Sequence, residues 1–306
     1  MTVKPIILDV DTGVDDALAI AYAVRSPEIE LLGLTTTFGN ITVEEATRNS
    51  LVVLEKLGRS DVPVHEGSTR PLVRTKEAYP RHIHGEHGLG SATFSAPAKS
   101  KSPLGAVDFI IETVHSRKNE VTLVCVGPLT NLAHVVRRDP EIARLVGRVV
   151  IMGGAARRPG NVSEYAEANI FSDPEAADIV FRSGLPITLV GLDVTMQTLL
   201  PMSSLPAWRE KDAELGGFFA DMTEFYIRFY EDAYPGIGGC GLHDPLAIGV
   251  VVKPELVETE PMHLAVELAG EQLARTREVP GERPNVDVCV KVDASGFLAH
   301  FLGRVI

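Results

Sequence analysis

The 306-residue chain has few of the features that mark secreted, membrane-spanning or nucleic-acid-binding proteins. Its three cysteines are far apart and form no CxxC pair, which argues against a disulfide framework or a cysteine-based metal site. No apolar run reaches the roughly 18 residues of a membrane span, and no leader segment is recognisable, so we expect a cytoplasmic protein. Acidic residues outnumber basic ones by 41 to 29, and the net charge of −12 disfavours nucleic acid and anionic membranes as partners.

The sequence is 45% hydrophobic, and its short apolar runs alternate with helical patterns. This alternation predicts an α/β protein with an open, mostly parallel, doubly wound sheet of the Rossmann-like kind. The expected strands are Ile6–Val10, Ile29–Thr37, Val62–His65, Val121–Gly127, Val149–Gly154 and Ile187–Val194. The expected helices are Ala17–Val24, Val43–Leu57, Leu104–Ser116, Leu129–Arg137 and Pro174–Ser183.

The pattern changes after Pro201, although no linker or internal repeat marks a boundary there. We therefore expect a single domain over residues 1–306, in which the C-terminal part adds extra helices and strands to the sheet. The expected additions are helices at Leu215–Tyr230 and Pro245–Val252 and strands at Val286–Val292 and Phe297–Leu302.

Four carboxylates lie where the first strand gives way to a helix: Asp9, Asp11, Asp15 and Asp16. Asp9 and Asp11 share one face of the strand, and Gly13 allows a sharp turn into the helix. Helix capping explains one or two of these acids, but the others would repel each other if nothing neutralised them. The cluster therefore predicts a hard divalent cation held by oxygen ligands.

Further candidate residues, all polar except Met152, follow the other strands, at the sheet edge where doubly wound folds bind ligands. Each has an ordinary structural explanation when taken alone, such as a turn or a helix cap. Together, amides and carboxylates at this edge suit a polyhydroxylated ligand held beside a metal. These residues are Asn40, Asn131, Met152, Asn161, Glu167, Asn169, His243 and Asp244.

The motif Asp9-x-Asp11-x-Gly13-x-Asp15-Asp16 resembles the N-terminal fingerprint of the calcium-dependent nucleoside hydrolases. Five further motifs follow in that family's order: Gly39-Asn40, Gly127-Pro128-Leu129-Thr130-Asn131, Met152-Gly153-Gly154, Glu167-x-Asn169 and His243-Asp244-Pro245. The resemblance covers nearly the whole chain. It implies hydrolysis of the N-glycosidic bond of ribonucleosides to free nucleobase and ribose, in nucleoside salvage or catabolism, by a homo-oligomer that is a tetramer or a dimer.

The same resemblance implies a role for individual residues. It makes Asp11, Asp16, Asp244 and the backbone carbonyl of Val126 ligands of Ca²⁺. It makes Asp15, Asn40, Met152, Asn161, Glu167 and Asn169 the contacts to ribose.

The chemistry of such a site assigns further tasks. Because N-glycosidic cleavage passes through an oxocarbenium-like state, the site must hold the sugar, supply a water and help the base leave. Asp11 is the expected base for a calcium-bound water, whose direct attack would invert the anomeric carbon. The resemblance also makes His243 the expected acid for the leaving base, with a structural role as the alternative, and its presence favours relatives that are not restricted to purines.

Two further segments are candidates for contact with the nucleobase. The stretch Ser68–Ser102 has little regular pattern, which is typical of loops that cover active sites or of disordered segments, and it carries His82, His84 and His87. We expect His82 to contact the substrate, with simple solvent exposure as the alternative. Tyr226 and Tyr230 lie one turn apart on a late helix and could stack on the base, or pack in the core.

Two other functions remain open from the sequence alone. A haloacid-dehalogenase-type phosphatase also ends its first strand in Asp-x-Asp, but here Thr12 precedes Gly13 and the pair Asp15-Asp16 is foreign to that pattern. A non-catalytic ribose or nucleoside binder is the second alternative. Release of ribose from nucleosides, set against phosphate-ester hydrolysis, distinguishes all three.

Overall fold

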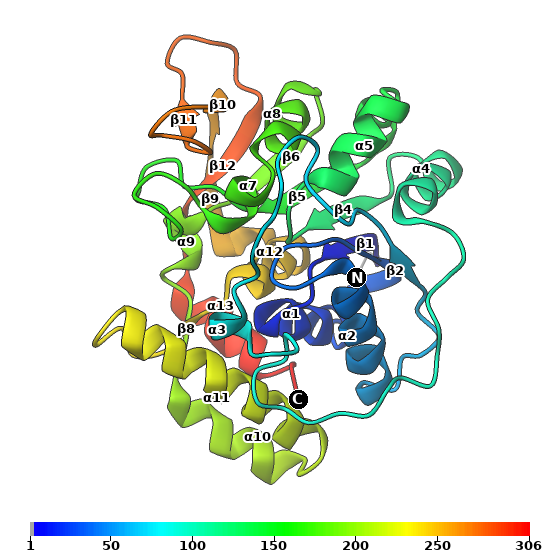
Figure 1. Cartoon of the computed structure of the whole chain (residues 1–306), viewed down its shortest axis with the longest axis vertical. Helices are drawn as coiled ribbons and strands as arrows, with labels where there is room; N and C mark the ends of the chain where they lie inside the picture. Colours follow the sequence, from blue (N-terminus) through cyan, green and yellow to red (C-terminus); the bar gives the residue numbers. More distant parts are fainter. Residues whose placement is uncertain (1–2) are drawn as a thin grey trace.

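The computed structural model describes residues 3–306 and is built around an eight-stranded sheet (Figure 1). Its strand order is β3-β2-β1-β4-β5-β6-β12-β9, and every neighbouring pair is parallel except β12 and β9. The strands are β1 (Lys4–Val10), β2 (Ile29–Thr36), β3 (Val64–Glu66), β4 (Thr122–Cys125), β5 (Arg148–Met152), β6 (Ile187–Val190), β9 (Val257–Met262) and β12 (Val286–Val292). The predicted mostly parallel α/β fold is confirmed.

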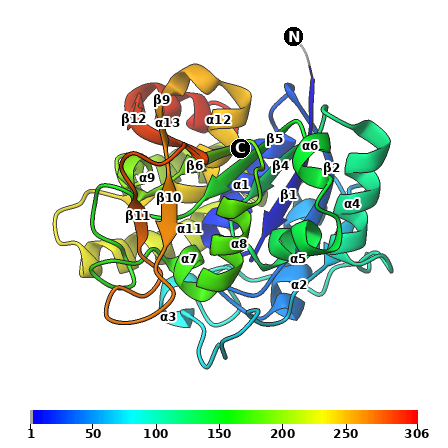
Figure 2. The same ribbon diagram turned by 90° about the horizontal axis from the view of Figure 1, so that it is seen from above.

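Helices cover both faces of this sheet, and each face has its own hydrophobic core (Figure 2). In β1, Ile6, Leu8 and Val10 point into one core and Ile7 into the other, because successive strand side chains face opposite ways. The first core contains α1 (Val14–Val24), α2 (Val43–Lys56), α11 (Leu215–Ala233) and α12 (His243–Val252). The second core contains α4 (Ala106–Arg117), α5 (Thr130–Arg138) and α8 (Pro174–Arg182).

The remaining elements are short. Among the described residues, no helix is long and apolar enough to cross a membrane. The short elements include the helices α3 (Arg81–His84), α6 (Ile142–Leu145), α7 (Ala168–Ser172), α9 (Leu192–Thr195) and α10 (Leu205–Lys211), and the strands β7 (Leu199–Leu200), β8 (Cys240–Gly241), β10 (Leu264–Val266) and β11 (Thr276–Glu278).

One predicted strand is wrong. Residues Phe297–Leu302 belong to the helix α13 (Ala294–Leu302), whose first turn is capped by the Asp293 side chain. Phe297 and Phe301 are both fully buried and lie four residues apart, which is the spacing of one helix face. A short apolar run of this kind does not distinguish a strand from a buried helix.

The expected strand Ile187–Val194 is also too long, since β6 ends at Val190. After Gly191 the chain forms the short helix α9, which carries Thr195 to the carboxyl edge of the sheet. The edge strand β9 was not predicted because four of its six residues are exposed and show no alternation. It pairs with β12 and extends the same sheet, which supports the single domain over residues 1–306 that we still hold as a prediction.

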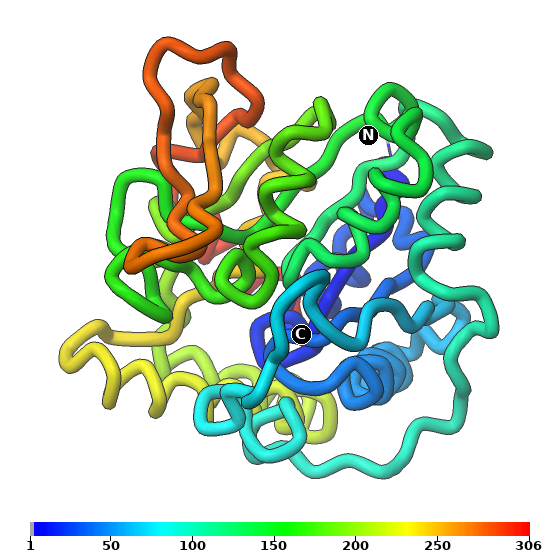
Figure 3. Tube along the Cα trace, turned by 45° about the horizontal axis from the view of Figure 1, so that its top comes forward, coloured from blue at the N-terminus to red at the C-terminus, as the bar shows by residue number. Residues whose placement is uncertain are grey.

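The fold brings together at one edge the segments that follow β1, β2, β4 and β5, because parallel strands all end on the same side. The long connection between β3 and α4 passes across this edge, and its short helix α3 packs against α11 (Figure 3). In Figure 3 the part of the connection that contains α3 is drawn in cyan, next to the yellow-green α11. The acidic motif, the amide motifs and the histidine-rich connection therefore meet in one place.

Candidate active site

The carboxyl edge of the sheet opens into a cavity of about 340 Å³. Three of the predicted site residues do not line it. Asp16 is fully buried and bonded to the backbone of Asp11. Asn131 donates to Asp9 Oδ1 at 2.8 Å, and both of these side chains are buried behind the cavity lining. The structure therefore brings the predicted residues together around a single cavity. Those that line it are Asp11, Asp15, Asn40, His82, Val126, Met152, Asn161, Glu167, Asn169, Tyr226, Tyr230, His243 and Asp244.

Buried carboxylates form one side of the cavity. Ligand oxygens of Asp15, Asp16 and Asp244 lie within 4.8 Å of one another. Burial first, and then the neighbouring carboxylates, raise the pKa of Asp15 and Asp244 well above the ordinary value. Burial and the charge of Asp16 do the same to the pKa of Asp11, whose Oδ1 is buried without a hydrogen-bond partner. Clustered oxygens with too few donors fit a hard divalent cation.

The backbone of the first turn holds Asp16 in place. Its Oδ1 accepts the Asp11 N–H at 3.0 Å, and its Oδ2 accepts the Gly13 N–H at 2.9 Å and the Asn40 amide at 3.1 Å. Capping therefore explains the orientation of Asp16. The Asn40 N–H donates to Asp11 Oδ2 at 2.6 Å, and a Cβ at Gly39 would collide with that oxygen. The Gly39-Asn40 motif thus allows the second strand to end directly against Asp11.

Amide and carboxylate groups from later strands form the adjoining wall. Glu167 caps α7, where its oxygens accept the N–H groups of Asn169 at 2.8 Å and Ile170 at 3.0 Å. The Asn169 amide donates to the Val126 carbonyl at 2.7 Å and to the Met152 carbonyl at 3.2 Å. The bond from Asn169 uses one lone pair of the Val126 carbonyl oxygen, so the second lone pair is free to bind a metal ion.

Asn161 differs from these residues because it lies on an exposed loop. Its side-chain oxygen accepts the Ala168 N–H at 3.0 Å at the start of α7. It therefore reaches the cavity from the rim, next to the capping residue Glu167.

A row of hydrogen-bonded side chains lies elsewhere on the cavity wall. His243 Nε2 and the Tyr230 hydroxyl are 2.5 Å apart, and that hydroxyl is 3.5 Å from the Tyr226 hydroxyl. On its other side, His243 Nδ1 is 2.7 Å from the Thr195 hydroxyl. Burial lowers the pKa of His243 to about 4, so the imidazole is neutral at pH 7. The row connects an imidazole to two phenols and can therefore pass a proton along hydrogen bonds.

Residues 6–299 match the family described as inosine-uridine preferring nucleoside hydrolase. The chain belongs to this family. The nucleoside hydrolase is 42% identical to uridine nucleosidase 1 of Arabidopsis thaliana. The similarity extends over 270 residues and covers 87% of this chain and 79% of that relative. It is 37% identical over 306 residues to the pyrimidine-specific ribonucleoside hydrolase RihA of Escherichia coli, with 98% of each chain covered.

Solved structures show the same relationship. A purine-preferring ribonucleoside hydrolase from Gardnerella vaginalis matches this nucleoside hydrolase with a TM-score of 0.96 and 43% identity, over 99% of this chain and 98% of that one. The plant nucleoside hydrolase PpNRh1 matches with a TM-score of 0.94 and 36% identity, over 99% of this chain and 98% of the plant enzyme. The predicted family is therefore confirmed, and with it the predicted function, the hydrolysis of ribonucleosides to base and ribose.

The structure of this hydrolase also shows site residues that the sequence did not suggest. Lys76 lines the cavity with its ammonium 3.3 Å from the Ser172 hydroxyl and 5.5 Å from the centre of the Tyr79 ring. It comes from the connection without a regular pattern, so no local signal pointed to it. Thr195, the partner of His243, was missed because the residues before it, up to Val194, were predicted to form a strand, whereas Thr195 is the last residue of the helix α9.

His82 and His84 occupy different environments although they are two residues apart. His82 is exposed at the cavity rim, with its ring edge-on to Phe229 at 5.8 Å. His84 is buried and stacks on Tyr226 at 5.4 Å, and its Nδ1 accepts the Val14 N–H at 3.2 Å. Burial lowers the pKa of His84 to about 3. His84 is therefore a neutral acceptor at the start of α1.

The wild type should lose folding stability as the pH falls because His84 is neutral in the folded chain, and replacing His84 by asparagine should abolish this part of the loss. An unfolded histidine titrates near 6.5, so between about pH 6.5 and 3 the unfolded chain binds a proton that the folded chain does not. The stability that His84 contributes is complete above this range and is lost as the pH falls. From about pH 7.5 to pH 5 the loss is about 2 kcal/mol.

Urea unfolding of the wild type and H84N in chelator, at both pH values, measures this effect. The carboxylate cluster titrates in both proteins and cancels in their difference. A difference in unfolding free energy that is the same at both pH values would contradict the assignment of a buried neutral His84.

Proposed function

We propose that this nucleoside hydrolase cleaves the N-glycosidic bond with Asp11 as general base and with the His243 row as the source of the proton for the leaving base. The observation that carries the proposal is that buried carboxylates line the same cavity as His243, Tyr230 and Tyr226, which form a hydrogen-bonded row that begins at Thr195. One group can then act on water and the other on the nucleobase of the same substrate.

The carboxylate side suits Ca²⁺, for which we propose Asp11, Asp16, Asp244 and the Val126 carbonyl as ligands. Asp15 also has a ligand oxygen close to those of Asp16 and Asp244, and we assign it to the ribose hydroxyls next to the ion. Bound calcium would supply positive charge that keeps the clustered carboxylates ionised and orients oxygens of the substrate.

Asp11 is the carboxylate best placed to accept a proton. Its Oδ2 is held by the Asn40 N–H, whereas its Oδ1 has no hydrogen-bond partner and the side chain lines the cavity. A water positioned against Oδ1 could lose its proton as it attacks the anomeric carbon. Attack from the side opposite the base would invert the anomeric configuration.

The sugar and the base would lie against different walls. Asp15, Asn40, Met152, Asn161, Glu167 and Asn169 are our proposed ribose contacts. His82 and the two tyrosines would contact the base. Because the imidazole of His243 is neutral at pH 7, we propose that a tyrosine hydroxyl of the row donates its proton to the leaving base and becomes a phenolate. The His243 imidazole would stabilise this phenolate by a hydrogen bond, and a proton from solvent would then restore the hydroxyl.

The direct test is product analysis with uridine and inosine. Free nucleobase and reducing sugar should form in equal amounts, while p-nitrophenyl phosphate should stay intact. Hydrolysis of the phosphate ester without ribose release would support the phosphatase alternative, and tight binding of nucleosides without turnover would support a non-catalytic binder.

Calcium should bind to one site per chain. Titration of chelator-treated protein should give a single saturable heat of binding, and Asp244→Asn should weaken it because one charged ligand becomes neutral. Asp173→Asn is a suitable control, since Asp173 is also buried but bonds to Thr130 and Leu72 instead. The metal assignment is wrong if calcium does not bind or if thorough chelation leaves turnover unchanged.

Several finer predictions stay predictions. They are a role in nucleoside salvage or catabolism, a cytoplasmic location, and a dimer or tetramer in solution. The relatives whose names state a base preference include pyrimidine-specific and purine-preferring enzymes, so the test panel includes both base classes.

A further inference from the structure

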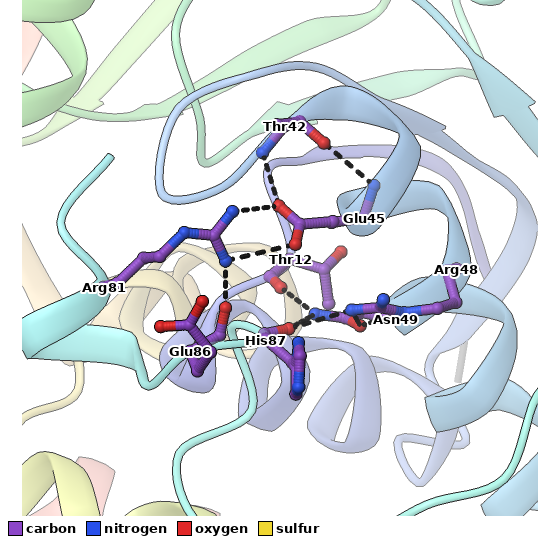
Figure 4. Close-up of polar contacts among 8 residues, drawn as sticks. All are labelled: Thr12, Thr42, Glu45, Arg48, Asn49, Arg81, Glu86 and His87. Carbon is purple, nitrogen blue, oxygen red and sulfur yellow. Dashed lines mark hydrogen bonds and ion pairs between the residues drawn. The ribbon is translucent and has the colours of Figure 1, made fainter. Parts of the chain in front are cut away.

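Helix α2 places a buried asparagine between two loops that line the cavity. The Asn49 amide nitrogen donates to the Thr12 carbonyl at 3.1 Å and to the His87 carbonyl at 2.8 Å (Figure 4). Thr12 belongs to the acidic turn, residues 11–16, and His87 belongs to the histidine segment, residues 81–90. One NH₂ group therefore joins the loop of the carboxylates to the loop of His82.

The orientation of this amide is determined by its neighbour. The Arg48 guanidinium donates to Asn49 Oδ1 at 3.2 and 3.0 Å, which leaves the NH₂ group facing the two carbonyls. A Cβ at Gly88 would lie 2.8 Å from Asn49 Nδ2, and Gly88 has a φ of +87°, a conformation that favours glycine. The histidine segment thus packs on Asn49 as closely as its backbone allows.

A second contact ties the histidine segment to the same helix. Arg81 forms an ion pair with Glu45 at 2.8 Å, and Glu45 also accepts the Thr42 N–H at the start of α2 (Figure 4). Arg81 is one residue before His82, so this pair anchors the segment's beginning while Asn49 anchors its end. Among these contacts, the Asn49 amide alone bonds to both loops.

We propose that Asn49 is a positioning residue that fixes the histidine segment against the acidic turn, and so sets the separation between the base-contacting and the sugar-contacting sides of the cavity. The inference rests on the proposed function, which assigns one side of the cavity to the base and the other to the sugar. No other common side chain of this length offers two donors from one atom. Aspartate would place an acceptor against both carbonyls. Leucine would leave the Thr12 carbonyl without this donor and the His87 carbonyl with only the Arg48 guanidinium, which is 3.1 Å away.

The test compares Asn49→Leu with Thr47→Val. Thr47 lies on the same helix, is also buried, and bonds to Val43 and Thr36 but to neither loop. Both variants lose buried hydrogen bonds, so both should be less stable. Only Asn49→Leu should speed amide hydrogen exchange in residues 81–90, by about tenfold or more, because the segment can then open locally.

Kinetics give the second readout. Asn49→Leu should lower kcat/KM for uridine or inosine by about ten- to a hundredfold beyond the Thr47→Val control, as expected when reacting groups move by about 1 Å. Calcium affinity should stay near that of the wild type, because Asp16 keeps its own N–H donors.

Equal exchange in residues 81–90 and equal kcat/KM in the two variants would overturn the proposal. Faster exchange without a kinetic effect would also overturn it, since Asn49 would then hold the segment without positioning catalysis. Hydrogen exchange does not depend on turnover. A wild type that hydrolyses no nucleoside would therefore contradict the proposed function, while the exchange result would still show whether Asn49 holds the segment.

Discussion

Replacing Asp11 by asparagine should lower the rate of nucleoside cleavage by about 10²–10⁴-fold, the usual contribution of a general base. The fold should survive, because the asparagine side-chain oxygen can still accept the Asn40 N–H that Asp11 Oδ2 accepts. What is lost is the negative charge and the second carboxylate oxygen, Oδ1, which has no hydrogen-bond partner. Single-turnover rates at saturating calcium measure the chemical step separately from metal binding.

Asp9→Asn is the matched control for this variant. Asp9 is also buried, and burial raises its pKa to about 7, but it bonds to Thr35 and Asn131 and does not line the cavity. The control should lose far less activity than Asp11→Asn. A near-normal single-turnover rate for Asp11→Asn with calcium bound would remove Asp11 from the role of base.

Replacing His243 by alanine should affect a natural nucleoside about 10²-fold more than p-nitrophenyl riboside. A nucleobase needs a proton to leave, whereas p-nitrophenolate departs unaided. His243 is placed for this task by hydrogen bonds to Tyr230 and Thr195 on its two ring nitrogens. Tyr230→Phe breaks one of these bonds while leaving the imidazole, and it should show the same selective loss for the nucleoside.

The comparison of the two substrates distinguishes catalysis from packing. Equal losses on both substrates would mean that His243 positions Asp244 or fills space beside it. A loss confined to purine nucleosides would show that pyrimidines use another donor, for which His82 at the cavity rim is the candidate.

Local signals in the sequence were sufficient for the acidic turn. The spacing from Asp9 to Asp16 around Gly13 is a short-range pattern, and the structure forms a strand, a tight turn and a helix there. The strands flanking it are buried on both faces, so their continuous apolar runs also predicted the parallel sheet. The order of the motifs, which matches that of the family, then assigned residues as distant in the sequence as Asp244 to the same site as the acidic turn.

The errors arose where the local pattern is ambiguous or absent. Phe297 and Phe301 in a short apolar run fit a strand or a helix, and only packing against Tyr22 in α1 decides between them. Lys76 and Asn49 carry no motif, because their contacts join segments far apart in the sequence. Such residues are found only when the fold is known.

The most direct test measures both active-site variants on both substrates in one experiment. Single-turnover rates are compared for Asp11→Asn and His243→Ala, with inosine or uridine and with p-nitrophenyl riboside. If carboxylate and imidazole act on opposite sides of one bond, Asp11→Asn should lose both reactions and His243→Ala only that of the nucleoside. The account is contradicted if the two variants show the same relative losses on the two substrates.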